Sequence, residues 1–263
     1  MNSSVRILAL ETSTHVGSVC LLENDQLISE RRSENQRAHS DFLNQAIEEV
    51  LTENSLKLKD VDLFATGIGP GSFTGIRIAL NAAKTFSYIF RKPLVAIDSL
   101  TLLAHGSSIG EAMDKTIGSS DSSAEQSRPV LTLINAYKNM TYTCVYQFKN
   151  SQWIQLREAE AVGVKSLSDW LLASPLTKDF TSFQVLGDGY KTYLPFFEPS
   201  VLEKMVRPED SSFDFPLAST LGQLAYELFL EKQTMDWKLL RPLYIRASEA
   251  EETKRGLIFT PLK

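Results

Sequence analysis

The sequence contains very little cysteine or histidine. Its 263 residues include two cysteines, Cys20 and Cys144, and three histidines, His15, His39 and His105. A disulfide scaffold or a sulfur-ligated metal cluster needs more cysteines at closer spacing. The histidines lack the H-x-x-x-H or H-E-x-x-H spacing of a zinc site. We therefore expect two buried free thiols in a reducing compartment and no metal ion bound by this chain.

Long apolar runs and excess positive charge are also missing. No stretch reaches the ~20 apolar residues of a membrane span, and residues 1–13 lack the apolar core of a signal peptide. The chain has 27 basic and 32 acidic side chains and a net charge of -5. Phosphate neutralisation supplies most nonspecific nucleic-acid affinity, so we expect poor binding of tRNA or DNA by this chain alone. These features predict a cytoplasmic protein without membrane contact.

What the sequence does contain is 43% hydrophobic residues, enough for a real core. Short β-rich runs at 5–10, 19–22 and 27–31 are separated by tight polar turns and predict an antiparallel meander. A second set lies at 130–134, 142–148 and 153–158. The order strand-strand-strand-helix-strand-helix thus occurs roughly twice, which indicates two copies of one α/β module. We predict a first domain at 1–105, a Ser-rich flexible insert at 106–128, a second domain at 129–246 and a tail at 247–263.

Two segments of the first module have helical periodicity. Residues 39–53 have an apolar stripe along one side of the expected helix. Ser40 can cap its free amides, and Asp41 complements the positive end of the helix dipole. The segment 76–90 is apolar around most of its circumference, which is typical of a helix buried on two sides, within its own fold or against a partner. The pattern alone leaves open whether both helices line one core. Ser99 is the expected N-cap of a third helix that begins at Leu100.

The most informative segment is the glycine loop, residues 67–75. A strand, a glycine-rich turn and a helix in this order aim backbone amides at an anion; the alternative is that the glycines only allow positive φ and close packing. A P-loop would need Lys and then Ser or Thr at its end, where Ser72-Phe73 stands. A dinucleotide fingerprint would need Gly at Ser72, although Asp98 ends the next strand. A nucleophile elbow would need Gly in place of Pro70.

The run from Gly69 to Arg77, GPGSFTGIR, resembles the glycine motif of the TsaB (YeaZ) family. That family is the noncatalytic relative of TsaD in bacterial tRNA threonylcarbamoyladenosine synthesis. The resemblance continues in the N-terminal strand with its ETST end, in His39-Ser40, in the GDG after a later strand, and in PLYIR at 242–246. It covers most of the chain, apart from the Ser-rich insert and the tail after Arg246.

The resemblance implies the fold of actin, Hsp70 and the sugar kinases, with two related α/β domains and a nucleotide cleft in active members. Those members carry Asp and Gly at the first hairpin, whereas this chain has Glu11 and no glycine before Gly17. We expect Glu11 to bind backbone amides rather than metal or phosphate, and we assign no catalytic residue. The positions that the motif would bring near a nucleotide are Glu11, Thr12, Ser13, Thr14, Gly69, Gly71, Ser72, Thr74, Gly75, Arg77, Gly187 and Gly189.

The metal-binding residues of TsaD-like enzymes are incomplete here. Those enzymes use a histidine pair at H-x-x-x-H spacing on the first helix, but His39 is followed by Leu43. Asn135 stands where many members have Asp. The resemblance therefore implies no metal site in this chain and no cofactor of its own, with ATP or ADP expected only at an interface of the assembled complex.

The family pairs TsaB with TsaD through the two N-terminal helices, and we expect the same here. The chain would be a structural and activating subunit that holds TsaD and helps recruit the ATPase TsaE, with tRNA bound only through the complex. The sequence leaves open whether the free chain is a homodimer. The expected interface residues are Phe42, Leu43, Ile47, Val50, Ile76, Leu80, Ala83 and Phe86.

Two other functions remain open at this point. An autonomous ATP-dependent kinase or hydrolase of the same fold would show magnesium-dependent ATPase activity that is lost on changing Glu11. A nucleotide-binding oxidoreductase would use the glycine loop and Asp98, and failure to bind any dinucleotide would dismiss it.

Overall fold

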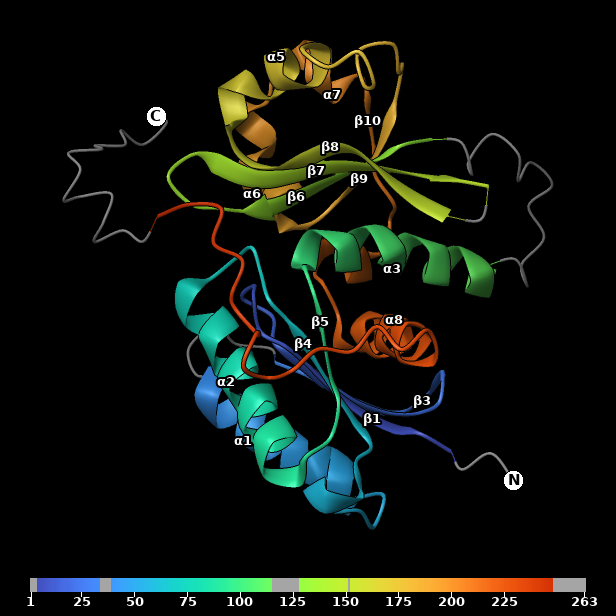
Figure 1. Cartoon of the computed structure of the whole chain (residues 1–263). Coiled ribbons are helices and arrows are strands. Elements are labelled where there is room, and N and C mark those ends of the chain that lie inside the picture. Colours follow the sequence, from blue (N-terminus) through green and yellow to red (C-terminus); the bar gives the residue numbers. More distant parts are fainter. Residues whose placement is uncertain (1–3, 34–38, 115–127, 151, 248–263) are drawn as a thin grey trace. The chain divides into compact units, whose positions relative to one another are not determined.

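A computed structural model describes residues 4–33, 39–114, 128–150 and 152–247 of the chain (Figure 1). Contacts divide the chain into two compact units. Unit 1 contains Met1–Leu102 and Pro216–Leu243, and unit 2 contains Leu103–Phe215 and Tyr244–Lys263. This division differs from the predicted boundaries, which placed 216–243 in the second domain; the helix of that segment packs on the sheet of unit 1. Most of the predicted tail lies outside the described residues.

Unit 1 is built on a five-stranded sheet with the order β3-β2-β1-β4-β5. The first three strands form the predicted antiparallel meander, and β4 and β5 extend it in parallel from β1. The strands are β1 (Arg6–Glu11), β2 (Ser18–Glu23), β3 (Gln26–Arg32), β4 (Leu63–Gly67) and β5 (Leu94–Ile97).

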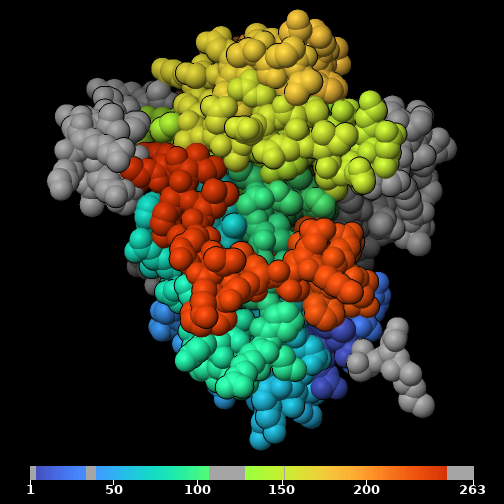
Figure 2. All heavy atoms as spheres, viewed as in Figure 1, coloured from blue at the N-terminus to red at the C-terminus, as the bar shows by residue number. Residues whose placement is uncertain are grey.

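Helices cover both faces of this sheet. Side chains alternate along a strand, so Leu8 and Leu10 of β1 pack with α1 (His39–Thr52) and α2 (Phe73–Phe90), whereas Ile7 and Ala9 pack with α8 (Ala218–Leu230). A short 3-10 helix, Leu58–Asp60, precedes β4. In Figure 2 the segment of α8 and the chain that follows it is coloured orange and lies on the surface of unit 1.

Unit 2 repeats the same sheet, with the order β10-β9-β6-β7-β8. Its first three strands form an antiparallel meander, and the next two are parallel to the first. The strands are β6 (Val130–Asn135), β7 (Met140–Lys149), β8 (Gln152–Gly163), β9 (Phe183–Leu186) and β10 (Met205–Val206). The helices are α5 (Leu167–Leu172), α6 (Asp188–Tyr193) and α7 (Pro199–Leu202), with 3-10 turns at Val164–Ser166, Leu194–Phe196 and Ser211–Asp214.

The predicted duplicated α/β module is confirmed: in both units the strand order is third, second, first, fourth, fifth. Cys20 and Cys144 are buried free thiols, as expected. Within the described residues, no helix is long and apolar enough to cross a membrane.

Two predictions about the third helix, α3 (Ser99–Asp114), were wrong. The composition break that begins at Gly106 was assigned to a flexible insert, but the helix continues to Asp114, and residues 115–127 lie outside the described part. The cap at its N-terminus is Asp98, because its Oδ1 accepts a 2.9 Å hydrogen bond from the amide of Thr101. Ser99 is instead the first residue of the helix, and its hydroxyl has another partner.

Candidate functional site

The candidate site of unit 1 is the end of β1, where the chain carries its first acid. Glu11 has no exposed surface. Its Oε1 accepts a 2.5 Å hydrogen bond from the backbone amide of Ser13, and its Oε2 accepts a 3.3 Å hydrogen bond from the hydroxyl of Ser99. Both oxygens are thus engaged by the chain itself. The expectation that Glu11 binds a backbone amide is confirmed.

Burial also changes the acidity of this group. Desolvation raises the pKa of Glu11 from 4.5 to about 7, and the hydrogen bonds from Ser13 and Ser99 oppose that rise. A carboxyl of this pKa is partly protonated near neutral pH. The pKa is raised because the carboxyl is removed from water. For the same reason, a dissolved metal ion or phosphate cannot reach it.

The glycine loop is packed backbone to backbone against the segment after β1. A Cβ added at Gly71 would lie 2.0 Å from the carbonyl oxygen of Ser13, and one at Gly75 would lie 2.0 Å from that of Thr12. Hydrogen bonds join the same two segments: the Ser72 amide donates to the Ser13 carbonyl at 2.6 Å, and the Thr12 hydroxyl donates to the Gly75 carbonyl at 2.7 Å. The structure therefore uses these two glycines for close packing, which was the alternative to anion binding.

The remaining loop residues have similar structural roles. Gly69 has a φ of 90°, and Ser72 caps α2 by accepting a hydrogen bond from the Gly75 amide at 3.2 Å. Thr14 is buried and donates to the carbonyl of Val16. Thr74 and Arg77 are exposed on the first turns of α2, where the guanidinium lies 5.4 Å from the Phe73 ring centroid.

The equivalent strand end in unit 2 has the same plan with different chemistry. Strand β6 ends at Asn135, whose Oδ1 accepts hydrogen bonds from the Tyr137 amide and, at 2.9 Å, from the Tyr193 hydroxyl. The buried Asp188 accepts the Asn135 amide at 2.9 Å. Gly187, with φ of 105°, and Gly189 bring the turn after β9 close to the Leu133 carbonyl, at 2.2 and 2.8 Å from their added Cβ atoms.

Neither strand end fits the metal or phosphate that the fold type implies. In unit 1 the acid is buried and both of its oxygens are hydrogen-bonded within the chain, and in unit 2 the acid is replaced by an amide. Within the described residues there is no group of three or more His, Cys, Asp or Glu side chains able to hold a metal ion. Asp98, considered for a dinucleotide, is engaged by the amide and hydroxyl of Thr101. The side chain of His39 lies outside the described part.

The predicted interface residues are placed differently from the expectation. Leu43, Ile47, Val50, Ile76, Leu80 and Ala83 are each at most 5% exposed and belong to the core between the sheet and its two helices, while Phe42 and Phe86 are half-buried against that core. The apolar stripes are therefore used by unit 1 itself. This corrects the prediction for six of the eight residues, because a partner cannot reach side chains that are already buried.

The surface that α1 and α2 offer to a partner is more polar. On α2 the exposed residues are Thr74, Arg77, Asn81 and Thr85, followed near its end by Tyr88 and Ile89, with Ile78 and Ala82 half-buried beside them. On α1 the exposed residues are Ser40, Asp41, Asn44, Gln45, Glu48 and Thr52. Sequence periodicity located the two helices but assigned the wrong face to the partner.

Comparisons with known proteins find relatives over nearly the full length of the chain. The family model TsaD, tRNA N6-adenosine threonylcarbamoyltransferase, matches residues 27–254. The chain is similar to the tRNA threonylcarbamoyladenosine biosynthesis protein TsaB of Bacillus subtilis, with 29% identity over 245 residues, 93% of this chain and 96% of the relative. The TsaB protein of Escherichia coli is 25% identical over 94% of this chain and 96% of its own length. The solved structure of YeaZ from Pseudomonas aeruginosa has the same fold, with a TM-score of 0.70 at 24% identity, over 91% of this chain and 99% of that one.

Proposed function

Because the chain belongs to the TsaB (YeaZ) family, we propose that it is a noncatalytic, activating subunit in the synthesis of tRNA threonylcarbamoyladenosine. In this proposal it pairs with TsaD, which transfers the threonylcarbamoyl group, and helps to form the surface where TsaE docks. The complex acts in the cytoplasm, tRNA is bound by the assembly, and any ATP or ADP lies at the interface with TsaD.

The observation that carries the noncatalytic part is the position of Glu11. This acid stands where active members of the fold type are expected to bind metal and phosphate, yet it is fully buried and hydrogen-bonded to Ser13 and Ser99. A fully buried carboxyl whose two oxygens are hydrogen-bonded within the chain stabilises the strand end and is not available to a substrate. The contribution of the chain to the reaction is then made through its surface.

The helices α1 and α2 are the surface that we assign to TsaD. They cover one face of the sheet of unit 1. Arg31 of β3 forms an ion pair at 3.0 Å with Glu49 of α1, which connects this helix to the sheet. A helix pair fixed in this way offers a preorganised face, which lowers the entropic cost of association. The contacts would come from the exposed residues, such as Asn81 and Thr85 on α2.

The test is binding to TsaD by a variant with bulk and charge added on this face. For Asn81→Arg with Thr85→Arg we expect at least about tenfold weaker binding, since buried unpaired charge at an interface is costly. Exposed helix positions tolerate such changes to within about 0.5 kcal/mol, so the variant should fold normally. The matched control is Thr181→Arg with Ser200→Arg, two exposed positions in unit 2.

Binding that is equal in both variants would refute the assignment of the helix face. Failure of the unmodified chain to bind TsaD at all would refute the subunit proposal. Magnesium-dependent ATPase activity of the purified chain that disappears in Glu11→Gln would instead support an autonomous kinase or hydrolase.

A further inference from the structure

Unit 2 has an open sheet edge. The strand order places β8 at one end of the sheet, with β7 as its only neighbour among the described strands. A strand at an edge presents a row of unpaired backbone amides and carbonyls, onto which another extended segment can add. With 12 residues, β8 has about twice the usual strand length, so this edge is long.

The second half of β8 is protected against such an addition. It carries the charged side chains of Arg157, Glu158 and Glu160, and the irregularities in its register with β7 fall between Gln155 and Glu160. Charges and bulges are the usual means by which proteins keep an edge strand from pairing. The open part of the edge is therefore the first half of the strand, from Gln152 to Gln155.

This first half has neither charge nor bulge. Residues Gln152–Gln155 pair with β7 in regular register. Their apolar side chains are only partly covered: Ile154 is 43% exposed, Trp153 is half-buried, and Phe148, which faces Trp153 across the two strands, is 36% exposed. The Trp153 ring centroid lies 5.4 Å from that of Phe148 and 5.2 Å from that of His105 on α3. An uncharged edge with exposed apolar side chains invites pairing with another strand.

The described chain ends beside the same strand. The Nη1 of Arg246 donates to the carbonyl of Ala136 at 2.7 Å, in the turn between β6 and β7. The last residue of β8, Gly163, pairs with Met140 at the end of this turn. All four residues belong to unit 2. A chain that continues from Arg246 along the outer side of β8 therefore runs from the end of that strand toward its beginning, antiparallel to it.

The sequence after Ala247, which lies outside the described residues, contains an apolar run of matching length. Leu257–Thr260 reads LIFT, which is rich in residues of high β-propensity, and it is bounded by Gly256 and Pro261, a pattern typical of a short strand. The stretch from Ala247 to Leu257 has as many residues as β8 has from Trp153 to Gly163. Extended at the usual rise per residue, the tail brings this run level with Trp153.

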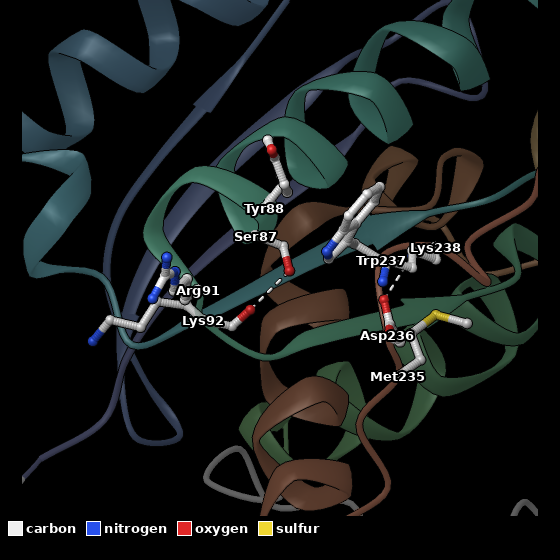
Figure 3. A pocket seen from close by; sticks show the side chains of 8 residues that line it. All are labelled: Ser87, Tyr88, Arg91, Lys92, Met235, Asp236, Trp237 and Lys238. Carbon is white, nitrogen blue, oxygen red and sulfur yellow. Dashed lines mark hydrogen bonds between the residues drawn. The ribbon is translucent and has the colours of Figure 1, made fainter.

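The surface pocket of unit 1 is a poorer place for an apolar run (Figure 3). It lies between the end of α2 and residues 235–238, and its lining includes the charged residues Arg91, Lys92, Asp236 and Lys238. Its two aromatic rings, Tyr88 and Trp237, already contact each other, with centroids 4.8 Å apart. The edge at Gln152–Gln155 has no charged side chain, and no described strand pairs with its outer side.

We propose that the C-terminal tail of this chain adds to the open edge of β8 as a further strand of the unit 2 sheet, with Leu257–Thr260 antiparallel to Gln152–Gln155. The backbone groups of the two segments then bond to each other. Successive side chains of a strand point to opposite faces of a sheet, so the run covers Ile154 on one face and Trp153 on the other. The tail thereby closes the edge to other chains.

The test compares backbone hydrogen exchange in the full chain and in a variant that ends at Ala247. The amides of Gln152–Gln155 that point away from β7 should exchange at least about tenfold more slowly in the full chain, because a strand ladder protects them. Ile258→Asp with Phe259→Asp should remove this protection, since charge opposes burial against apolar side chains. The matched control, Leu172→Asp with Leu176→Asp, adds the same charges at exposed apolar positions of unit 2 and should stay within about twofold.

Three results would overturn the proposal. The first is equal exchange of these amides in the full chain and in Ile258→Asp with Phe259→Asp, a comparison that remains valid if the truncated variant does not fold. The second is protection that is lost on about tenfold dilution, because the added strand would then come from a second copy of the chain. The third is protection that occurs only when TsaD is bound. Protection in the free, dilute full chain alone supports the proposal, whether or not the chain binds TsaD.

Discussion

The ends of β1 and β6 occupy the same place in two copies of one module but have different chemistry. In unit 1 the last residue is an acid, Glu11, held by a backbone amide and a serine hydroxyl. In unit 2 it is an amide, Asn135, held by a backbone amide and a tyrosine hydroxyl. In both units glycines bring the neighbouring turn against a strand-end carbonyl. In both units the side chain at the strand end is hydrogen-bonded by groups of the chain itself. This arrangement does not need a charged residue at that position.

Filling one of the two closest contacts between a glycine and another backbone segment should have the largest effect. Gly71→Ala places a Cβ 2.0 Å from the Ser13 carbonyl, so the backbone must move. We expect the free energy of unfolding to fall by about 3 kcal/mol, the upper end of the range that is typical of overpacking. Gly189→Ala in unit 2, at 2.8 Å, should lose less. Chemical denaturation measures both variants. Gly163→Ala, whose added Cβ has its nearest neighbour at 3.7 Å, is the control, and a loss equal to that of Gly71→Ala would contradict this account.

Removing the charge of Glu11 should change how stability depends on pH. Because its folded pKa of about 7 is above the ordinary 4.5, the folded chain binds more protons than the unfolded one between these values. The free energy of unfolding therefore falls as pH rises from about 4.5 to about 7, by a total on the order of 3 kcal/mol. Glu11→Gln keeps an acceptor for the Ser13 amide and should lack this decrease.

The comparison is made by denaturation at pH 5 and pH 8. At pH 8 the free energy of unfolding of Glu11→Gln should be at least as large as that of the unmodified chain. At pH 5 it should be no larger. Asn135 of unit 2 does not titrate, so its side chain adds no such slope. If the free energy of unfolding changes equally with pH in the two proteins, Glu11 is ionised in the folded chain at no cost in stability, which would contradict its raised pKa.

Removing one hydroxyl from each strand end should have the smallest effect. Ser99→Ala deletes a donor to Glu11, and Tyr193→Phe deletes a donor to Asn135; each should lower the free energy of unfolding by about 1 kcal/mol. The losses should differ in pH dependence. The Ser99 hydrogen bond lowers the pKa of Glu11, so its removal matters more at pH 8 than at pH 5, whereas the effect of Tyr193→Phe should be equal at both.

Local patterns predicted the fold well because each module repeats them. The tight turns of residues 5–31 and the helical stripe of 39–53 are short-range signals, and the structure has both the meander and α1. The N-cap of α3 was missed by one residue, since Asp98 and Ser99 are both good caps by type. Only the position of Glu11 beside Ser99, 88 residues away, shows why Asp98 caps the helix.

The surface was harder to predict than the core. Apolar periodicity shows which side of α1 and α2 is buried, but it does not show whether the sheet or a partner buries it. The contact between Tyr88 and Trp237 was missed for a different reason: the two residues lie far apart in sequence and meet only because residues 216–243 pack within unit 1. A contact of that range leaves no local pattern.

The central claim is that the chain acts through the outer face of its helices and not through the acid at its strand end. The most direct measurement is tRNA threonylcarbamoyladenosine formation by TsaD supplemented with the unmodified chain, with Glu11→Gln, or with Asn81→Arg and Thr85→Arg. Glu11→Gln should support modification to within about twofold, and the helix variant should lose at least about tenfold. Loss of modification in Glu11→Gln while it still binds TsaD would contradict the claim.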